Sequence, residues 1–143
     1  MPNVRAINSK KYDISKHRFA ELYHFCLQYN EWKEQLKIYR DTLKSPRITG
    51  MPVQHGTADL TAELAVQRSL LTDKCSIVEE TAREIDDEIF PYLLKAVTNE
   101  GITYNYLALV CGMPCGKDRY YDRRRKFYCL LSQKMENRNH GTK

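Results

Sequence analysis

The strongest constraint on this chain is a long stretch, from Ala58 to Asp86, that contains neither proline nor glycine. Branched apolar residues return every seventh position along it, at Leu64, Leu71, Val78 and Ile85. This spacing predicts one helix about 43 Å long, at a rise of 1.5 Å per residue. A helix of that length has to lie against another helix. The partner is either a helix of its own chain or the same helix of a second copy in a homodimer.

The segments before it also have the pattern of helices. Ser15 and Asn30 are suitable N-caps, and apolar residues follow each of them at helical spacing as far as Leu43. We therefore expect a helical hairpin from about Ser15 to Leu43, after a loose basic start. Residues 45–57 contain two prolines and two glycines, which predicts a linker loop. Because no segment alternates as a β-strand does, the expected fold class is all-α.

Composition narrows the class of protein. A chain of 143 residues with 42% apolar side chains can build one core. No run is long and apolar enough for a membrane span, and the first residues do not have the pattern of a signal peptide. Five cysteines at uneven spacing argue against a disulfide framework. We therefore expect no membrane contact and a location in the cytoplasm.

The positive charge is concentrated at the C-terminal end. From Gly116 to Lys143 there are nine basic and three acidic residues, whereas the preceding part has 14 basic and 15 acidic residues. A basic block at one end of a nearly neutral chain is typical of proteins that bind polyanions. The alternative interpretation is a solvated tail that aids solubility.

A helix-turn-helix pattern coincides with this basic block. Thr103 can cap a short helix, residues 112–116 (GMPCG) form a turn, and a basic helix is expected from Lys117 to Met135. In such a motif the second helix enters the major groove of DNA. Its apolar side chains should share one face and bury, namely Tyr120, Phe127, Tyr128, Leu131 and Met135, with Arg124 among them.

The charged side of this helix supplies the candidate DNA contacts. Arg119, Arg123 and Lys126 are the preferred ones, because arginine can donate two hydrogen bonds to a guanine and lysine neutralises phosphate. Lys117, at the start of the helix, suits a backbone phosphate. Asp122 can accept from a cytosine amine or, with Asp118, complement the helix dipole. The predicted DNA-binding set is Lys117, Arg119, Tyr121, Asp122, Arg123, Arg125 and Lys126.

Three stretches resemble a known family. They are YNEWKEQLKIYRDTL (29–43), TAELAVQRSLL (61–71) and ITYNYLALVCGMPCGKDRYYDRRRKFYCLLSQ (102–133). They resemble Gram-positive phage regulators of the RinA and ArpU type, whose C-terminal helix-turn-helix is similar to sigma region four. The resemblance implies a sequence-specific, double-stranded DNA-binding regulator of phage or prophage genes. The implied setting is a bacterial host cell, with host RNA polymerase as a further partner.

The expected organisation therefore has five parts. They are a hairpin with a loose start (1–44), a linker loop (45–57), a long helix with a dimer seam (58–86), a sigma region four-like helix-turn-helix domain (87–136) and a disordered tail (137–143).

The sequence also leaves other functions open. A phage-encoded helical protein-interaction module, either an inhibitor or a polymerase adaptor, would use the long helix 58–86 as its working surface. A packaging subunit that recognises DNA as a ring is a third alternative. The acidic residues between Glu79 and Glu88 are interpreted as a solvated surface or a contact for a basic partner. No catalytic constellation, metal site or cofactor site is predicted, so the chain is not expected to be an enzyme.

Overall fold

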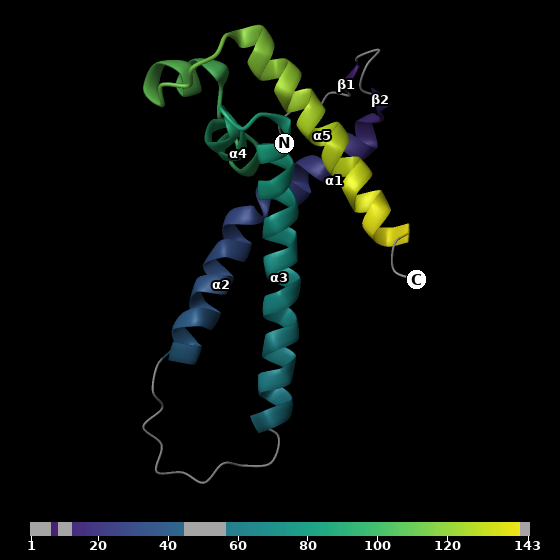
Figure 1. Cartoon of the computed structure of the whole chain (residues 1–143), viewed down its shortest axis with the longest axis vertical. Helices are drawn as coiled ribbons and strands as arrows, with labels where there is room; N and C mark the ends of the chain where they lie inside the picture. Colours follow the sequence, from purple (N-terminus) through teal and green to yellow (C-terminus); the bar gives the residue numbers. More distant parts are fainter. Residues whose placement is uncertain (1–6, 9–12, 45–56, 141–143) are drawn as a thin grey trace.

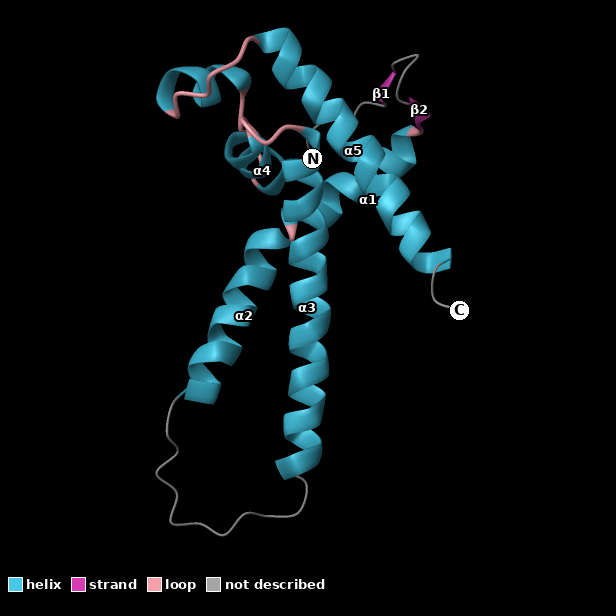
Figure 2. Cartoon of the chain, in the orientation of Figure 1, coloured by secondary structure: helices cyan, strands magenta, loops and turns pink. Residues whose placement is uncertain are grey.

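The computed structural model describes residues 7–8, 13–44 and 57–140. This part of the chain is almost entirely helical, as the all-α prediction requires (Figure 2). The exception is a short antiparallel pair of strands, β1 (Ile7–Asn8) and β2 (Asp13–Ile14), in which Ile7 faces Ile14. Two residues per strand are too few to produce a readable alternation, so the sequence did not predict this pairing.

The first two helices form, but they do not pair as a hairpin. Helix α1 (Lys16–Leu27) is capped by the Ser15 hydroxyl, which accepts a hydrogen bond from the Arg18 amide at 3.1 Å. Helix α2 (Tyr29–Lys44) begins after the single residue Gln28, which is too short a link for a chain reversal. The two helices therefore diverge, and α2 runs beside the long helix α3 (Thr57–Ile85) instead (Figure 1).

The predicted cap at Asn30 is also wrong. Asn30 lies inside the first turn of α2, and its side-chain amide donates to the Thr98 carbonyl at 3.1 Å and to the Asn99 side chain at 3.0 Å. The residue therefore ties α2 to the end of a distant helix. A polar side chain near a helix start can satisfy tertiary partners as well as its own backbone, and spacing alone does not separate the two uses.

The long helix is confirmed to within one residue at each end. Leu71 and Val78 of its seven-residue row are buried, and Leu64 and Ile85 are half-buried. Helices of the same chain cover this row, because α2 packs along α3 and the end of α3 enters the main core. Of the two partners that the sequence left open, the structure shows the one from the chain itself.

One main core joins the parts that the sequence analysis separated. It contains Phe19 of α1, Trp32 of α2, Val78 of α3, Leu93 of α4 (Phe90–Thr98) and Phe127 of α5 (Lys117–His140). The predicted segments 1–44, 58–86 and 87–136 therefore all contribute residues to this main core. Of the predicted linker 45–57, only Thr57, the first residue of α3, lies within the described residues.

A second, smaller core lies under the C-terminal elements. Ile89, Leu107, Met113 and Tyr120 are buried together where α4, the π-helical turn η1 (Tyr106–Val110) and the start of α5 meet. Helix α5 continues to His140, so the predicted disordered tail is wrong for residues 137–140, and residues 141–143 lie outside the described part. Its predicted apolar face is confirmed, with Met135 half-buried and the other four side chains buried.

Candidate nucleic-acid interface

The start of α5 is held by the turn that precedes it. Gly112 adopts φ +76°, a conformation that favours glycine, and reverses the chain after η1. The Tyr104 hydroxyl then donates to the Cys115 carbonyl at 2.9 Å, while its ring stacks on Tyr120 with 5.9 Å between ring centroids. The Gly112 turn and the Tyr104 contacts therefore hold the first turn of α5 in place independently of its charged residues.

Arg119 faces the protein, against the corner between α3 and α4. Its Nη2 lies 2.8 Å from Oδ2 of Asp86, its Nε lies 3.1 Å from the same oxygen, and its Nη1 lies 2.8 Å from Oε1 of Glu88. The Asp86 side chain is only 7% exposed. This is a two-pronged pair at a carboxylate with little access to water, which is the stronger class of ion pair.

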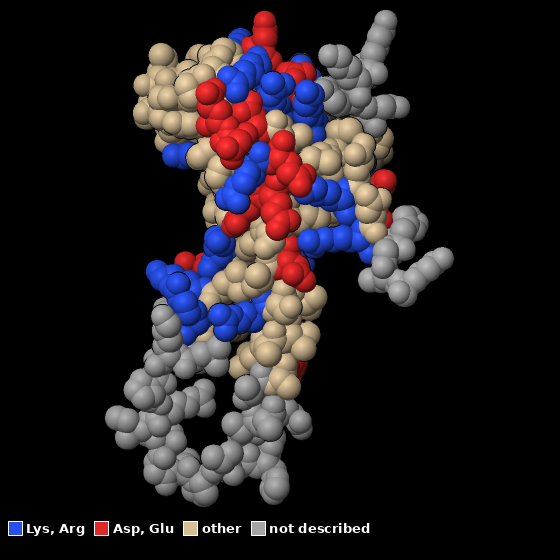
Figure 3. Space-filling view, in the orientation of Figure 1, with Lys and Arg blue, Asp and Glu red and all other residues tan. Residues whose placement is uncertain are grey.

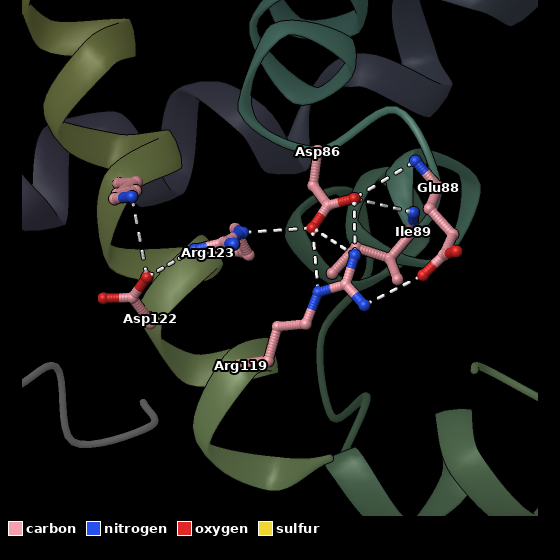
Figure 4. A network of polar contacts seen from close by, with 7 residues as sticks. Asp86, Glu88, Ile89, Arg119, Asp122 and Arg123 are labelled. Atoms are coloured by element: carbon pink, nitrogen blue, oxygen red, sulfur yellow. Dashed lines mark hydrogen bonds and ion pairs between the residues drawn. The ribbon is translucent and has the colours of Figure 1, made fainter. Parts of the chain in front are cut away.

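Arg123 approaches the same carboxylate from the next turn of α5. Its Nε lies 3.0 Å from Oδ2 of Asp86, and its Nη1 lies 2.7 Å from Oδ2 of Asp122. Asp122 also lies 3.8 Å from the Lys126 ammonium. Figure 4 shows Asp86 between the two guanidinium groups. The result is one network that joins α5 to the end of α3.

Asp86 has a second task at the same corner. Its Oδ1 accepts hydrogen bonds from the amides of Glu88 at 3.1 Å and Ile89 at 3.3 Å, which orders the turn into α4. Burial raises the pKa of this carboxyl, but the hydrogen bonds from Arg119 and Arg123 outweigh it and hold the pKa below its usual value. The same contacts with Asp86 and Glu88 raise the pKa of Arg119.

The opposite side of α5 carries a different set of residues. Lys117, Tyr121 and Arg125 follow one another at every fourth position, about 120° to 160° around the helix from Arg119 and Arg123. Lys117 and Tyr121 are exposed and Arg125 is half-buried. Among the described residues, neither Lys117 nor Arg125 has an ion-pair partner. We call these three residues the outer row.

The outer row is confined to the first turns of the helix. Further along the same side, Ser132 is buried and accepts a hydrogen bond from Arg18 of α1 at 2.9 Å. Arg124 lies with the core residues, as predicted, and its guanidinium covers the rings of Phe19 and Tyr128 at 5.8 and 5.3 Å. On this side of α5, the accessible basic residues are therefore those of its first turns.

The structure thus divides the predicted DNA-binding set in two. Arg119, Arg123, Asp122 and Lys126 belong to the Asp86 network, whereas the outer row points elsewhere. Arg119 and Arg123, the preferred base contacts, are paired with Asp86 instead of being free at the helix surface. Rotation around an isolated helix does not show which neighbour lies beside its charged residues. Asp86 is the site residue that sequence reasoning missed.

A signal for this pairing was present in the sequence. The acidic run that ends α3 is opposite in sign to the basic start of α5, and the fold brings the two together. Glu84 lies 2.8 Å from Lys134, and Glu79 lies 3.2 Å from Lys33 of α2. Figure 3 shows the acidic side chains gathered between two groups of basic ones. Within α5, four of the eight Lys and Arg side chains are therefore paired with acidic groups of the chain, namely Arg119, Arg123, Lys126 and Lys134.

All five cysteines are free, and in the described ranges no three His, Cys, Asp or Glu side chains are grouped to hold a metal ion. Across these same residues, none of the helices has the length and apolar character needed to cross a bilayer. Comparisons with protein-family models, curated proteins and solved structures give no significant match to this chain.

Proposed function

We propose that this protein is a sequence-specific regulator that binds double-stranded DNA through the outer row of α5. The observation that carries the proposal is that Lys117, Tyr121 and Arg125 share one side of α5, where Lys117 and Tyr121 are exposed and Arg125 is half-buried. Arg119 and Arg123, toward the other side, are bound to Asp86. A rigid helix that presents a basic side beyond the protein body suits a major groove. The assignment to phage or prophage genes, and to host polymerase as a partner, rests on the family resemblance alone.

Each member of the outer row has a chemical role in this proposal. Lys117 stands at the amino end of α5, where an ammonium and free backbone amides both favour a phosphate. Arg125 can make a two-pronged contact with guanine, and the Tyr121 hydroxyl can reach a phosphate or a base edge. Arg119 and Arg123 act as positioning residues, because they hold α5 at its angle to the body.

The experiment that tests the proposal begins with selection of bound duplexes from a random pool. Binding of the selected duplex is then compared for the wild type, Arg125→Ala and the matched control Arg138→Ala, an exposed arginine near the other end of α5. We expect Arg125→Ala to cost about 1 to 3 kcal/mol at the selected site, with an unchanged melting temperature. Failure of the wild type to enrich any sequence would overturn the proposal.

A second candidate function is a helical protein-interaction module. It is favoured by apolar side chains that the fold leaves uncovered on the outer side of α3, where Val66 is 58% and Leu70 is 52% exposed. Leu109 and Val110, on the turn before α5, are 83% and 70% exposed. Exposed apolar patches mark interaction sites when they are contiguous. Such an adaptor would not retard DNA alone, and Val66→Asp with Leu70→Asp would abolish its capture by purified bacterial RNA polymerase.

A further inference from the structure

A groove between α2 and α3 contains a second set of basic side chains. It encloses about 310 Å³ and is lined by Lys33, Leu36, Lys37, Arg40, Arg68 and Thr72. Three of its cations lie on α2 at the spacing i, i+4, i+7, which places them on one side of that helix. Arg68 and Thr72, four residues apart, line the facing side of α3. The groove therefore has basic groups on both walls.

Part of the positive charge of this groove is not balanced by ion pairs within the described residues. Lys33 pairs with Glu79, but within the described residues neither Lys37 nor Arg68 makes an ion pair. Glu31 and Glu34 of α2 do not compensate for them, because they fall about 100° to 160° around the helix from Lys33. In the sequence, the excess of positive charge lies in the last 28 residues. In the folded chain, Lys37 and Arg68 add positive charge without an ion-pair partner in this groove.

We infer that this groove is a second contact for the phosphate backbone of the duplex that α5 reads. This inference rests on the proposed function. About 27 Å of helix separates Arg68 from Asp86, where α5 is anchored, and one turn of duplex spans about 34 Å. Figure 3 shows basic side chains over α5 and over the pair of α2 and α3 on one face of the molecule. A duplex of little more than one turn is therefore long enough to extend from the groove to the anchored start of α5.

The acidic side chains between the two groups do not exclude this arrangement. Four of them, Glu79, Glu84, Asp86 and Glu88, already have a basic partner in the chain. A phosphate backbone also fits the groove better than an acidic protein segment does. Leu36 is the one aliphatic side chain among the lining residues, and protein interfaces need a more apolar centre.

The test compares two doubly substituted full-length chains that lose the same charge. Lys37→Ala with Arg68→Ala removes the groove cations, and Lys16→Ala with Arg138→Ala removes an exposed lysine and arginine elsewhere. Binding of the selected duplex and of a random duplex is measured over a series of salt concentrations. We expect the groove variant to weaken binding of both duplexes equally and to reduce the slope of log affinity against log salt by about 2. The control slope should stay unchanged.

A second readout needs no substitution. In the wild type, bound duplex should protect Lys37 from amine acetylation and leave Lys16 reactive, as measured by mass spectrometry. If the wild type binds DNA but the groove variant keeps its slope, the groove inference fails and the proposed function stands. If the variant loses binding of an acidic poly-glutamate peptide while its DNA affinity is unchanged, the groove serves a protein instead. If the wild type binds no duplex, both proposals fall together.

Discussion

At the scale of single residues, Asp86 connects the end of α3 to both α4 and α5. Its Oδ2 accepts hydrogen bonds from Arg119 and Arg123 of α5, and its Oδ1 orders the turn into α4. Removing this carboxylate should lower stability, because the guanidinium and amide groups that donate to it would have only water as a replacement. Asp86 therefore links the position of the candidate DNA-binding helix to the stability of the whole chain.

Replacing Asp86 by Asn should lower the free energy of unfolding at pH 7 by about 2 kcal/mol, through loss of the paired charges and a weakened turn. Since the pKa of Asp86 is lowered in the folded state, its contribution is complete above the unfolded pKa, about 4, and disappears as the pH falls through the folded value. Urea unfolding at pH 7 and pH 3 measures this. The gap between variant and wild type should narrow at pH 3, and the exposed neighbour variant Asp87→Asn should behave as wild type.

Tyr128 presents the opposite case, a buried polar atom that the described residues leave without a hydrogen-bond partner. Burial raises the pKa of this phenol, so it stays protonated. Tyr128→Phe should keep the ring contact with Phe19, at 4.8 Å, and raise stability by about 1 kcal/mol. Tyr29→Phe is the matched control, because it loses a hydrogen bond to Glu79 and should be destabilised. A lower melting temperature for Tyr128→Phe would mean that its hydroxyl is satisfied in solution.

At the scale of elements, the connection between α4 and α5 departs from regular α-helix in its hydrogen bonding. The sequence predicted a short helix capped by Thr103, and the Thr103 hydroxyl does accept from the Tyr106 amide at 3.1 Å. The segment then widens into a π-helical turn, closed by the Cys111 amide on the Tyr106 carbonyl at 3.2 Å. Leu107 is buried by this turn while Leu109 and Val110 remain exposed, so one short segment both anchors α5 and presents an apolar tip.

The turn formed by residues 112–116 needs glycine at its first position but not at its last. Gly112 has φ +76° with open space around it, so Gly112→Ala should cost about 1 kcal/mol through backbone strain alone. Gly116 has no positive φ and equally open surroundings, and Gly116→Ser should leave stability unchanged or slightly higher, because serine is a good N-cap. Thermal melts of the two variants compare them directly. Equal losses would contradict the assignment of strain to Gly112.

At the scale of the whole molecule, α3 has two different halves. From Leu71 onward it supplies buried residues to the main core, whereas residues 65–70 are all exposed. The α2 and α3 pair therefore extends from the body as an arm, as Figure 1 shows. The outer row lies on α5 in the body, and the groove lies between α2 and α3 on the arm. One turn of duplex is long enough to extend from one to the other.

This division predicts uneven hydrogen exchange along a single helix. Amides of residues 62–70 should exchange much faster than those of residues 75–85, because few buried contacts resist local opening there. Exchange followed by mass spectrometry after proteolysis resolves the two segments, with residues 127–132 of α5 as a protected reference. Equal protection of both halves would show that another surface, such as a second copy, covers Val66 and Leu70 in solution.

The sequence by itself determined the helical class, the extent of α3, the cap at Ser15 and the buried face of α5. These depend on apolar periodicity and local capping, which act within a few turns of one helix. Tertiary structure alone decided that α2 pairs with α3, that Arg119 and Arg123 turn inward to Asp86, and where positive charge remains unpaired. Charges that are more than 30 residues apart in sequence meet only after the core has formed, so the spacing of residues within one segment carries no record of their pairing.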